Sequence, residues 1–393
     1  MAISDKIRDS IEKSSWIRKM FEEGARLKAE FGADNVYDFS LGNPDLEPPA
    51  EFFNVLNNIS SSRIAGIHGY MPNSGFTDVR NSVAAKIKKE HQLDLDGNSV
   101  VMTCGAAGGM NIIMKTILDP GDEVIVIKPF FAEYGFYISN HQGVMVQVES
   151  SPDFSINIDN IKKVITDKTR AVIINSPNNP TGKIYTESDI ENLAALLSSK
   201  TPSGRPIFLV SDEPYREIVY DGKKASPVLS KYKNTFVVSS YSKSLSLPGE
   251  RIGYVAVNPQ MTDHDLVMGG LNLSNRILGF VNAPALMQRI VSQLNNVSVA
   301  VDVYKKRRDL FINGLREAGY SFSDPEGAFY LFVKTPSDDD VDFVRHLQKY
   351  NILAVPGVGF GGPGYFRLAY CVSEDIIKRA IPKFKEALST YRG

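Results

Sequence analysis

The chain has 393 residues, of which 43% are hydrophobic, and carries 44 basic and 45 acidic side chains. This length allows one large core and a second, smaller one. The balanced charge favours neither nucleic acid nor an anionic membrane as a partner. Two cysteines and five scattered histidines exclude a disulfide framework and a cysteine-ligated zinc site, so we expect no metal.

The N-terminal part of the chain predicts no targeting or membrane segment. Its first 30 residues are rich in charge and lack an apolar signal core, and no later apolar run approaches the length of a bilayer span. We therefore expect a cytoplasmic protein. Residues 5–31 repeat apolar side chains at helical spacing, and a Gly/Pro loop follows a short strand at Tyr37. A second turn-rich stretch precedes a helix expected over 76–90.

Residues 99–258 alternate between short apolar runs and helical stretches. The runs are continuous, as in strands that are covered on both faces. Helices are expected between several of them, at 108–118 and 187–198 for example. This alternation predicts an α/β fold with a mostly parallel sheet between helices, whose strand ends gather the functional loops at one crevice. The expected strands lie at 100–102, 124–127, 144–148, 171–174, 207–210, 236–238 and 254–257.

The pattern changes after about residue 284. A long helix is expected over 284–318, followed by three short strands and two helices, the last beginning at Glu374. This part predicts a smaller α+β domain. We expect a large domain over 50–284, and a small domain made of 285–393 together with the N-terminal segment 1–49.

The segment Ser240–Arg251, which reads SYSKSLSLPGER, connects two predicted strands. A lysine among small residues at a strand end can be desolvated, which lowers its pKa and frees the amine to form a Schiff base. The arginine eight positions later, with the neighbouring serines, offers donors that match a phosphate. An exposed loop lysine and a strand-capping arginine are the alternative for this segment taken alone.

This segment resembles the lysine signature of the fold-type I pyridoxal-phosphate (PLP) aminotransferases of class I/II, the family that includes aspartate aminotransferase. The resemblance continues, in order and with similar spacing, from Gly42 to Arg367. It implies PLP as cofactor and Lys243 as the lysine that carries it as an internal aldimine. It also implies transfer of an amino group from an L-amino acid to a 2-oxo acid by a ping-pong mechanism, with Lys243 as the general acid/base.

The resemblance also assigns roles to other positions. Asp212 would pair with the pyridine nitrogen and keep it protonated, since a buried carboxylate favours the cationic ring. Tyr215 and Asn179, in the motifs DEPY and NNPTG, would bond the phenolic oxygen of the cofactor. Phe131 would stack on the ring, although a core phenylalanine is nearly as good an interpretation. The implied phosphate contacts are Gly105, Ala106, Ala107, Ser240, Ser242 and Arg251.

Four further positions concern the substrate and a partner subunit. Arg367, inside an apolar strand, would bind the substrate α-carboxylate, and Gly42 would add its backbone N–H. The alternative for Arg367 is a structural ion pair with a nearby acid. Tyr70 would reach the phosphate of a neighbouring subunit, which implies a homodimer. Arg276 lies in a region where a second arginine could read a distal carboxylate, but the sequence does not align it.

Three other functions compete with transamination as interpretations of this sequence. A PLP-dependent C–S β-lyase would share almost all of these residues. A non-catalytic regulator of the same fold would need an additional DNA-binding segment or basic patch, and the sequence has neither. A nucleotide-binding α/β protein would need GxxxxGK[ST], which is absent, or GxGxxG opening a helix after a strand. The glycines at 357–364 match GxGxxG by spacing but lie outside the alternating region 99–258.

Overall fold

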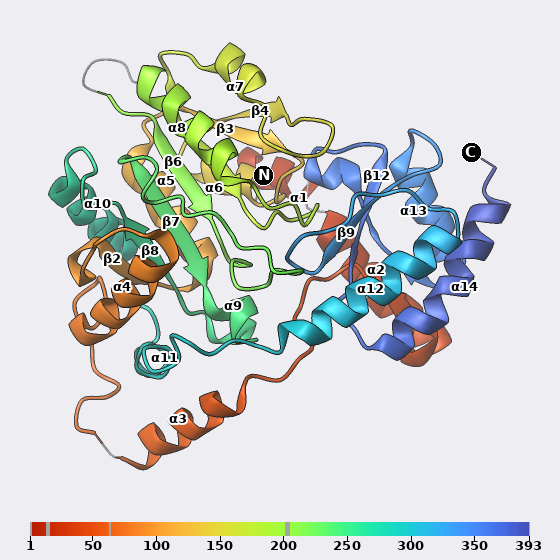
Figure 1. Cartoon of the computed structure of the whole chain (residues 1–393), viewed down its shortest axis with the longest axis horizontal. Helices are drawn as coiled ribbons and strands as arrows, with labels where there is room; N and C mark the ends of the chain where they lie inside the picture. Colours follow the sequence, from red (N-terminus) through yellow and green to blue (C-terminus); the bar gives the residue numbers. More distant parts are fainter. Residues whose placement is uncertain (1, 13–15, 63, 201–204, 393) are drawn as a thin grey trace.

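A computed structural model describes residues 2–12, 16–62, 64–200 and 205–392. Its centre is a seven-stranded sheet with the strand order β2-β8-β7-β6-β5-β3-β4. Strand β8 is antiparallel to both of its neighbours, and the other neighbouring pairs are parallel. The predicted α/β fold with a mostly parallel sheet between helices is thus confirmed (Figure 1).

Successive side chains of each strand point to opposite faces of the sheet, and helices cover both faces. In β3, Val124 and Val126 pack with α5, α6 and α10, whereas Ile125 and Ile127 pack on the other face with α7 and α8. Helices α3, α4 and α11 cover that other face near β2 and β8. Because both faces are buried, the strands read as continuous apolar runs in the sequence.

The strands of this sheet match the expected runs closely, and the helix α5 begins three residues earlier than expected. The strands are β2 (Val100–Thr103), β3 (Glu123–Lys128), β4 (Val144–Glu149), β5 (Thr169–Asn175), β6 (Phe208–Asp212), β7 (Thr235–Ser240) and β8 (Gly253–Val257). The helices are α3 (Ala50–Ser61), α4 (Thr77–His91), α5 (Gly105–Ile117), α6 (Tyr134–Asn140), α7 (Ile158–Val164), α8 (Glu187–Lys200), α9 (Tyr241–Ser244), α10 (His264–Ile277) and α11 (Ala285–Val291).

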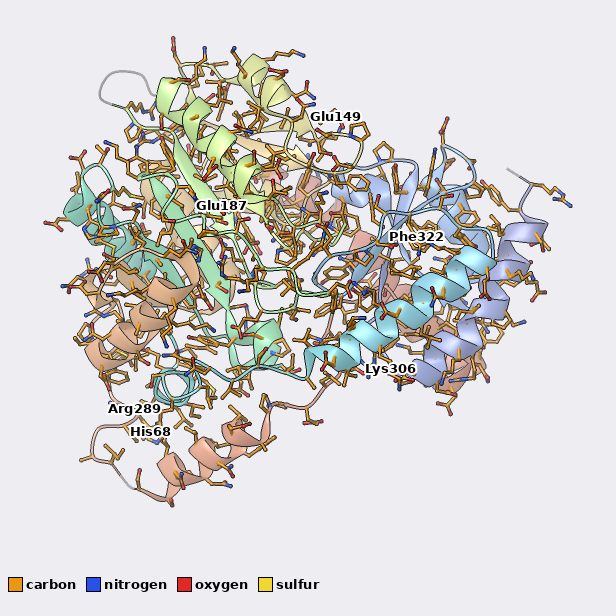
Figure 2. All side chains as sticks on the ribbon, in the orientation of Figure 1. His68, Glu149, Glu187, Arg289, Lys306 and Phe322 are labelled. Atoms are coloured by element: carbon orange, nitrogen blue, oxygen red, sulfur yellow. The ribbon has the colours of Figure 1, made fainter. Side chains whose placement is uncertain are left out.

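A second core joins the C-terminal part of the chain to residues near the N-terminus. Strand β9 pairs antiparallel with β12, which pairs with β11, and β1 pairs parallel with β10. Helices α12 and α14 pack on this part at the right of Figure 1, and the exposed Lys306 (Figure 2) bridges them by its ion pair of 2.8 Å with Glu374. The elements are α1 (Asp5–Glu12), α2 (Trp16–Phe31), β1 (Tyr37–Asp38), α12 (Val301–Glu317), β9 (Tyr330–Lys334), α13 (Asp340–Gln348), β10 (Ile352–Leu353), β11 (Val355–Pro356), β12 (Tyr365–Ala369) and α14 (Glu374–Thr390).

The single helix predicted over 284–318 is wrong. The chain forms α11 and α12 there, and the residues between them are not helical. Polar groups of that connection bond other elements instead: the Asn295 amide donates to the Ser82 carbonyl at 2.8 Å, and the Val299 N–H donates to the Ser244 carbonyl at 2.7 Å. Such bonds compete with a helical backbone.

The division into domains at 49/50 and 284/285 stays a prediction. Side chains of α11 share a core with α3 and α4, including Met287, Ile290 and Val291. This packing favours a boundary between α11 and α12. Residues 37–39 pair with β10 and β12, in agreement with placing the N-terminal segment in the small domain.

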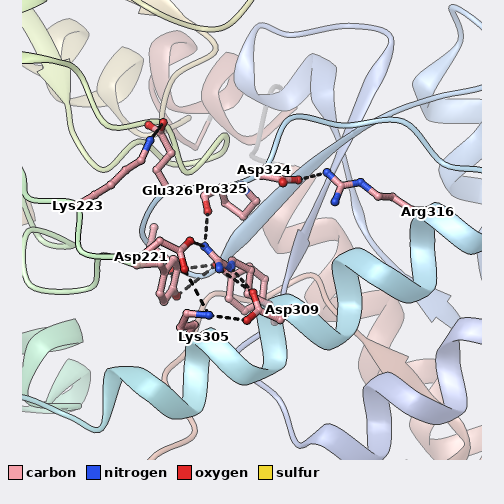
Figure 3. Close-up of polar contacts among 12 residues, drawn as sticks. Asp221, Lys223, Lys305, Asp309, Arg316, Asp324, Pro325 and Glu326 are labelled. Carbon is pink, nitrogen blue, oxygen red and sulfur yellow. Dashed lines mark hydrogen bonds and ion pairs between the residues drawn. The ribbon is translucent and has the colours of Figure 1, made fainter.

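An ionic cluster ties α12 to two loops (Figure 3). Arg308 donates to Asp221 at 2.7 Å and to the Pro325 carbonyl at 3.2 Å. Lys305 lies between Asp221 and Asp309, at 3.3 and 2.7 Å. The cluster therefore fixes the N-terminal half of α12 against the segment that follows Tyr215 and Tyr220.

Candidate active site

A cavity of about 340 Å³ opens where β5, β6 and β7 end. Carboxyl ends of neighbouring parallel strands meet at one edge, which is where such sheets bind ligands. Most of the predicted site residues line it, and Gly105 and Tyr70 do not. The predicted residues in the lining are Gly42, Ala106, Ala107, Phe131, Asn179, Asp212, Tyr215, Ser240, Ser242, Lys243, Arg251 and Arg367.

Lys243 lies on the short helix α9, immediately after β7. Its Nζ donates to the Gly42 carbonyl at 2.7 Å and lies 5.5 Å from the ring centre of Phe329. Burial lowers the pKa of the Lys243 amine to about 8, and the charges of Arg367 and Arg251 act in the same direction. The unprotonated amine, which is the state needed to attack a carbonyl carbon, is therefore far more populated near neutral pH than in a solvated lysine.

Asp212 ends β6 with its side chain buried at the floor of the cavity. Its Oδ2 accepts a hydrogen bond of 2.6 Å from the Tyr134 hydroxyl, and its Oδ1 has no partner among the described residues. Burial raises the pKa of the carboxyl to about 7, although the Tyr134 bond opposes this. A buried carboxylate oxygen without a donor is costly, and a ligand that carries an N–H would satisfy it.

Asn179 and Tyr215 are held by hydrogen bonds that the sequence did not predict. Asn175, at the end of β5, accepts from the Asn179 N–H at 2.7 Å and donates to the Asp212 carbonyl at 2.8 Å. The Tyr215 hydroxyl lies 2.8 Å from that of Tyr330. The loop that carries Asn179 and the end of β6 that carries Asp212 are therefore connected through one buried amide.

Arg367 is the best evidence for a bound carboxylate. Its guanidinium is 1% exposed, donates to the Ser40 carbonyl at 2.6 Å and to Asn179 Oδ1 at 3.1 Å, and leaves Nε without a partner. No acidic side chain of the described residues forms an ion pair with it, which argues against a structural ion pair. A buried guanidinium without a carboxylate is costly, and a ligand could supply one.

The opposite end of the cavity offers donors to an anion. Ala106 and Ala107 belong to the first turn of α5, where backbone N–H groups are not used by the helix. Gly105 lies beneath Arg251: its φ is +72°, and an added Cβ would approach Arg251 Nη2 to 2.8 Å. Arg251 is itself fixed by a bond of 2.9 Å from Nη1 to the Pro248 carbonyl. Ser240 and Ser242 complete this end.

One of the three remaining positions, Phe131, lies in the cavity wall, whereas Tyr70 and Arg276 lie outside the cavity. Phe131 forms part of the cavity wall and packs edge-on against Tyr134, with ring centres 5.6 Å apart. Tyr70 is 95% exposed, away from the cavity of its own subunit. Arg276 is exposed in the last turn of α10 and does not line the cavity.

Five polar side chains that line or support the cavity were not predicted as site residues. Tyr134, Asn175 and Tyr330 bond predicted residues, whereas Glu133 and Tyr137 line the wall near Phe131. A signal existed for three of them, because Glu133, Tyr134 and Asn175 each stand within four residues of a predicted site position. Tyr330 lies more than a hundred residues from Tyr215, and only the fold brings them together.

The comparisons decide the family. The model of the family "Aminotransferase class I and II" matches residues 34–384. The chain belongs to the class I and II aminotransferases. A solved amino transferase from Eubacterium rectale is 38% identical, with a TM-score of 0.96 over the full length of both chains. A probable aspartate/prephenate aminotransferase from Aquifex aeolicus is 32% identical, over 90% of this chain and 91% of its own. The aspartate aminotransferase from Thermus thermophilus, solved with maleate, is 27% identical, with a TM-score of 0.89 over 99% of this chain and 100% of its own.

The chain is therefore an aminotransferase with pyridoxal phosphate as cofactor. The cavity fits this group, because it combines an amine with a lowered pKa, a buried carboxylate oxygen without a donor and an anion-binding helix end. Among the described residues, no cluster of metal-binding side chains occurs and no helix is long and apolar enough to cross a bilayer.

Proposed function

We propose that this aminotransferase moves an amino group from an L-amino acid to a 2-oxo acid by a ping-pong mechanism, in the cavity around Lys243. The observation that carries the proposal is the buried Arg367, which has no acidic partner among the described residues and lies in the same cavity as the Lys243 amine. Arg367 would bind the α-carboxylate of each substrate in turn, together with the backbone N–H of Gly42.

When bound, pyridoxal phosphate supplies an aldehyde carbon that takes the amino group and a ring that takes up the electron pair left at Cα. Lys243 would supply the amine that holds the cofactor between turnovers. When it is free, the same amine would take the Cα proton of the substrate as general base and give it back as general acid. Asp212 would hold a proton on the ring nitrogen through its free Oδ1. Asn179 and Tyr215 would donate to the phenolic oxygen, and Phe131 would keep the ring in place.

We propose that the phosphate lies between the first turn of α5 and Arg251, with Ser240 and Ser242 as further donors.

We also propose a homodimer in which Tyr70 reaches the phosphate of the partner subunit. Two features support this: Tyr70 is 95% exposed, and Ile7 and Ile11 of α1, with Ile3 just before the helix, are exposed apolar side chains at helical spacing, at 51%, 58% and 50% exposure. A cytoplasmic location stays a prediction.

The test is the half-reaction of the holoenzyme with single amino acids, followed by absorbance, and borohydride reduction with peptide mapping. We expect a reduced cofactor adduct on Lys243 and a 2-oxo acid product. Lys243→Ala should abolish turnover, and the surface change Lys231→Ala should not. Release of ammonia and thiol without an oxo acid acceptor would favour the β-lyase. An adduct on another lysine would refute the role of Lys243.

A further inference from the structure

The cavity contains one charged side chain that the proposed reaction does not use. Its charged lining residues are Glu133, Asp212, Lys243, Arg251 and Arg367. The last four serve the ring nitrogen, the aldehyde carbon, the phosphate and the α-carboxylate. Glu133 has no such task. Every cationic side chain that this subunit contributes to the lining therefore has a role toward the cofactor or the α-carboxylate, and the one charge without a role is negative.

Glu133 stands on the wall of the cavity, between Phe131 and helix α6. Its backbone is fixed, since its carbonyl accepts from the N–H groups of Phe136 and Tyr137, both at 3.0 Å. Its carboxylate has neither a hydrogen bond nor an ion pair with any residue that the structure describes, and burial alone raises its pKa. The side chain is neither fully buried nor freely solvated.

An unpaired carboxylate at the edge of a substrate cavity acts on the charge of whatever enters. It repels a second carboxylate and attracts an ammonium or an N–H donor, and the interaction is stronger in a partly dry cavity than in bulk water. A distal carboxylate would also find no compensating cation from this subunit: positions 106 and 107 are alanines, and Arg276 lies outside the cavity.

We propose that Glu133 is a specificity-determining residue that disfavours substrates with an acidic side chain and favours those with a cationic or hydrogen-bond-donating one. The proposal rests on the proposed function, because it places the substrate side chain beyond the α-carbon held by Arg367. The expected preference differs from the substrate that the names of two relatives, both aspartate aminotransferases, refer to.

The experiment compares the holoenzyme with Glu133→Gln, which keeps the shape and removes the charge. The substrates are glutamate and glutamine, which differ only in the charged end. We expect the ratio of kcat/KM for glutamate over glutamine to rise about tenfold in the variant, the size of one like-charge contact in a partly solvated cavity. The value of kcat/KM for lysine as substrate should fall about tenfold in Glu133→Gln. Glu149→Gln, at the exposed end of β4 (Figure 2), removes one acid outside the cavity and should leave every ratio unchanged.

A binding measurement separates specificity from turnover. Calorimetric titration of the holoenzyme with glutarate and with its monoamide should show that glutarate alone binds about tenfold tighter to Glu133→Gln. Glu133→Lys should extend the trend and favour glutarate further. The same glutamate-to-glutamine ratio in wild type and Glu133→Gln, with glutarate binding unchanged, would overturn the proposal. If no amino acid reacts with any form of the enzyme, the proposed function fails instead, and the glutarate titration still decides the role of Glu133.

Discussion

At the scale of single residues, two environments set the chemistry of the cavity. Arg367 is buried with carbonyl and amide partners and no acid among the described residues, and Lys243 is partly buried with a backbone carbonyl as its bond partner. Each group is therefore incomplete without a ligand. The sequence could identify both positions, but it could not distinguish an arginine that binds a substrate from one that pairs with an internal acid.

The first residue-scale prediction concerns Arg367→Ala. We expect KM for the amino acid to rise by a factor that corresponds to about 2–5 kcal/mol, the cost of losing a charged, buried hydrogen-bond pair. Steady-state kinetics over a range of substrate concentrations measures this. Arg379→Ala, which removes an arginine paired with Asp375 on the exposed side of α14, should leave KM unchanged. An unchanged KM in Arg367→Ala would reduce Arg367 to a structural role.

The second residue-scale prediction is a pH dependence. Burial lowers the pKa of Lys243 from 10.5 to about 8, so the neutral amine becomes the main form as the pH rises through about 8. The rate at which apoenzyme captures added pyridoxal phosphate should therefore rise with pH up to about 8 and then level off. Stopped-flow absorbance measures the rate. A rate that still climbs steeply above pH 9 would mean that the amine titrates like a solvated lysine.

At the scale of elements, a buried ionic network holds the segment after β6 against α4. Glu213 accepts from Arg216 at 2.9 Å and from the Ser211 hydroxyl at 2.6 Å, and its Oε2 lies 3.3 Å from His91 Nε2. His91 Nδ1 accepts from the Val228 and Leu229 N–H groups, which leaves the proton on Nε2, facing Glu213. This network fixes the residue next to Asp212, and it therefore positions the acid on the cavity floor.

Glu213→Gln should destabilise the enzyme strongly. It removes the charge that Arg216 and His91 face in a dry environment, and losing one partner of a buried pair costs about 3–5 kcal/mol. The pKa of Glu213 is lowered to about 2, mainly by Arg216 and His91 against the opposing effect of burial, so the charge is present at any working pH. Urea unfolding of the holoenzyme measures the loss.

Asp221→Asn is the matched comparison for Glu213→Gln. It breaks the half-exposed pairs of Asp221 with Arg308 and Lys305 in Figure 3 and should cost no more than about 1 kcal/mol. Equal effects of the two variants would contradict the view that burial decides the strength of these ion pairs.

A second element-scale prediction tests the contact between α12 and α14. A Cβ at Gly314 would approach Ile381 Cγ1 to 2.7 Å, whereas a Cβ at Gly269 in α10 would have no neighbour within 4 Å. Gly314→Ala should therefore destabilise the enzyme by about 1–3 kcal/mol through overpacking. Gly269→Ala should be neutral or gain up to about 1 kcal/mol from helix propensity. Thermal unfolding of both variants compares them, and a stabilised Gly314→Ala would show that α14 can move aside.

At the scale of the whole molecule, the proposed homodimer predicts complementation between subunits. Tyr70→Ala and Lys243→Ala homodimers should each be impaired. In a hybrid dimer, one site would combine the intact Lys243 of one subunit with the intact Tyr70 of the other. Equal mixing with random exchange should restore about a quarter of wild-type activity, since half of the dimers are hybrids with one intact site. If Tyr70 acted within its own subunit, mixing would restore none.

The sequence by itself determined the alternation of strands and helices and the positions that carry the chemistry. Both are local properties: continuous apolar runs mark strands buried on two faces, and Lys243, Asp212 and Asn179 stand in short motifs at strand ends. The strand order then brings those ends together without further information, because parallel neighbours share one edge.

Only the tertiary structure decided which side chains support these positions and where the long C-terminal pattern breaks. Tyr330 meets Tyr215, and Asn175 joins Asp212 to Asn179, through contacts that span different strands. The segment between α11 and α12 is not helical because Asn295 and Val299 form hydrogen bonds with backbone groups far away in the chain. Such choices depend on partners far away in the chain, and local propensity is too weak to fix them.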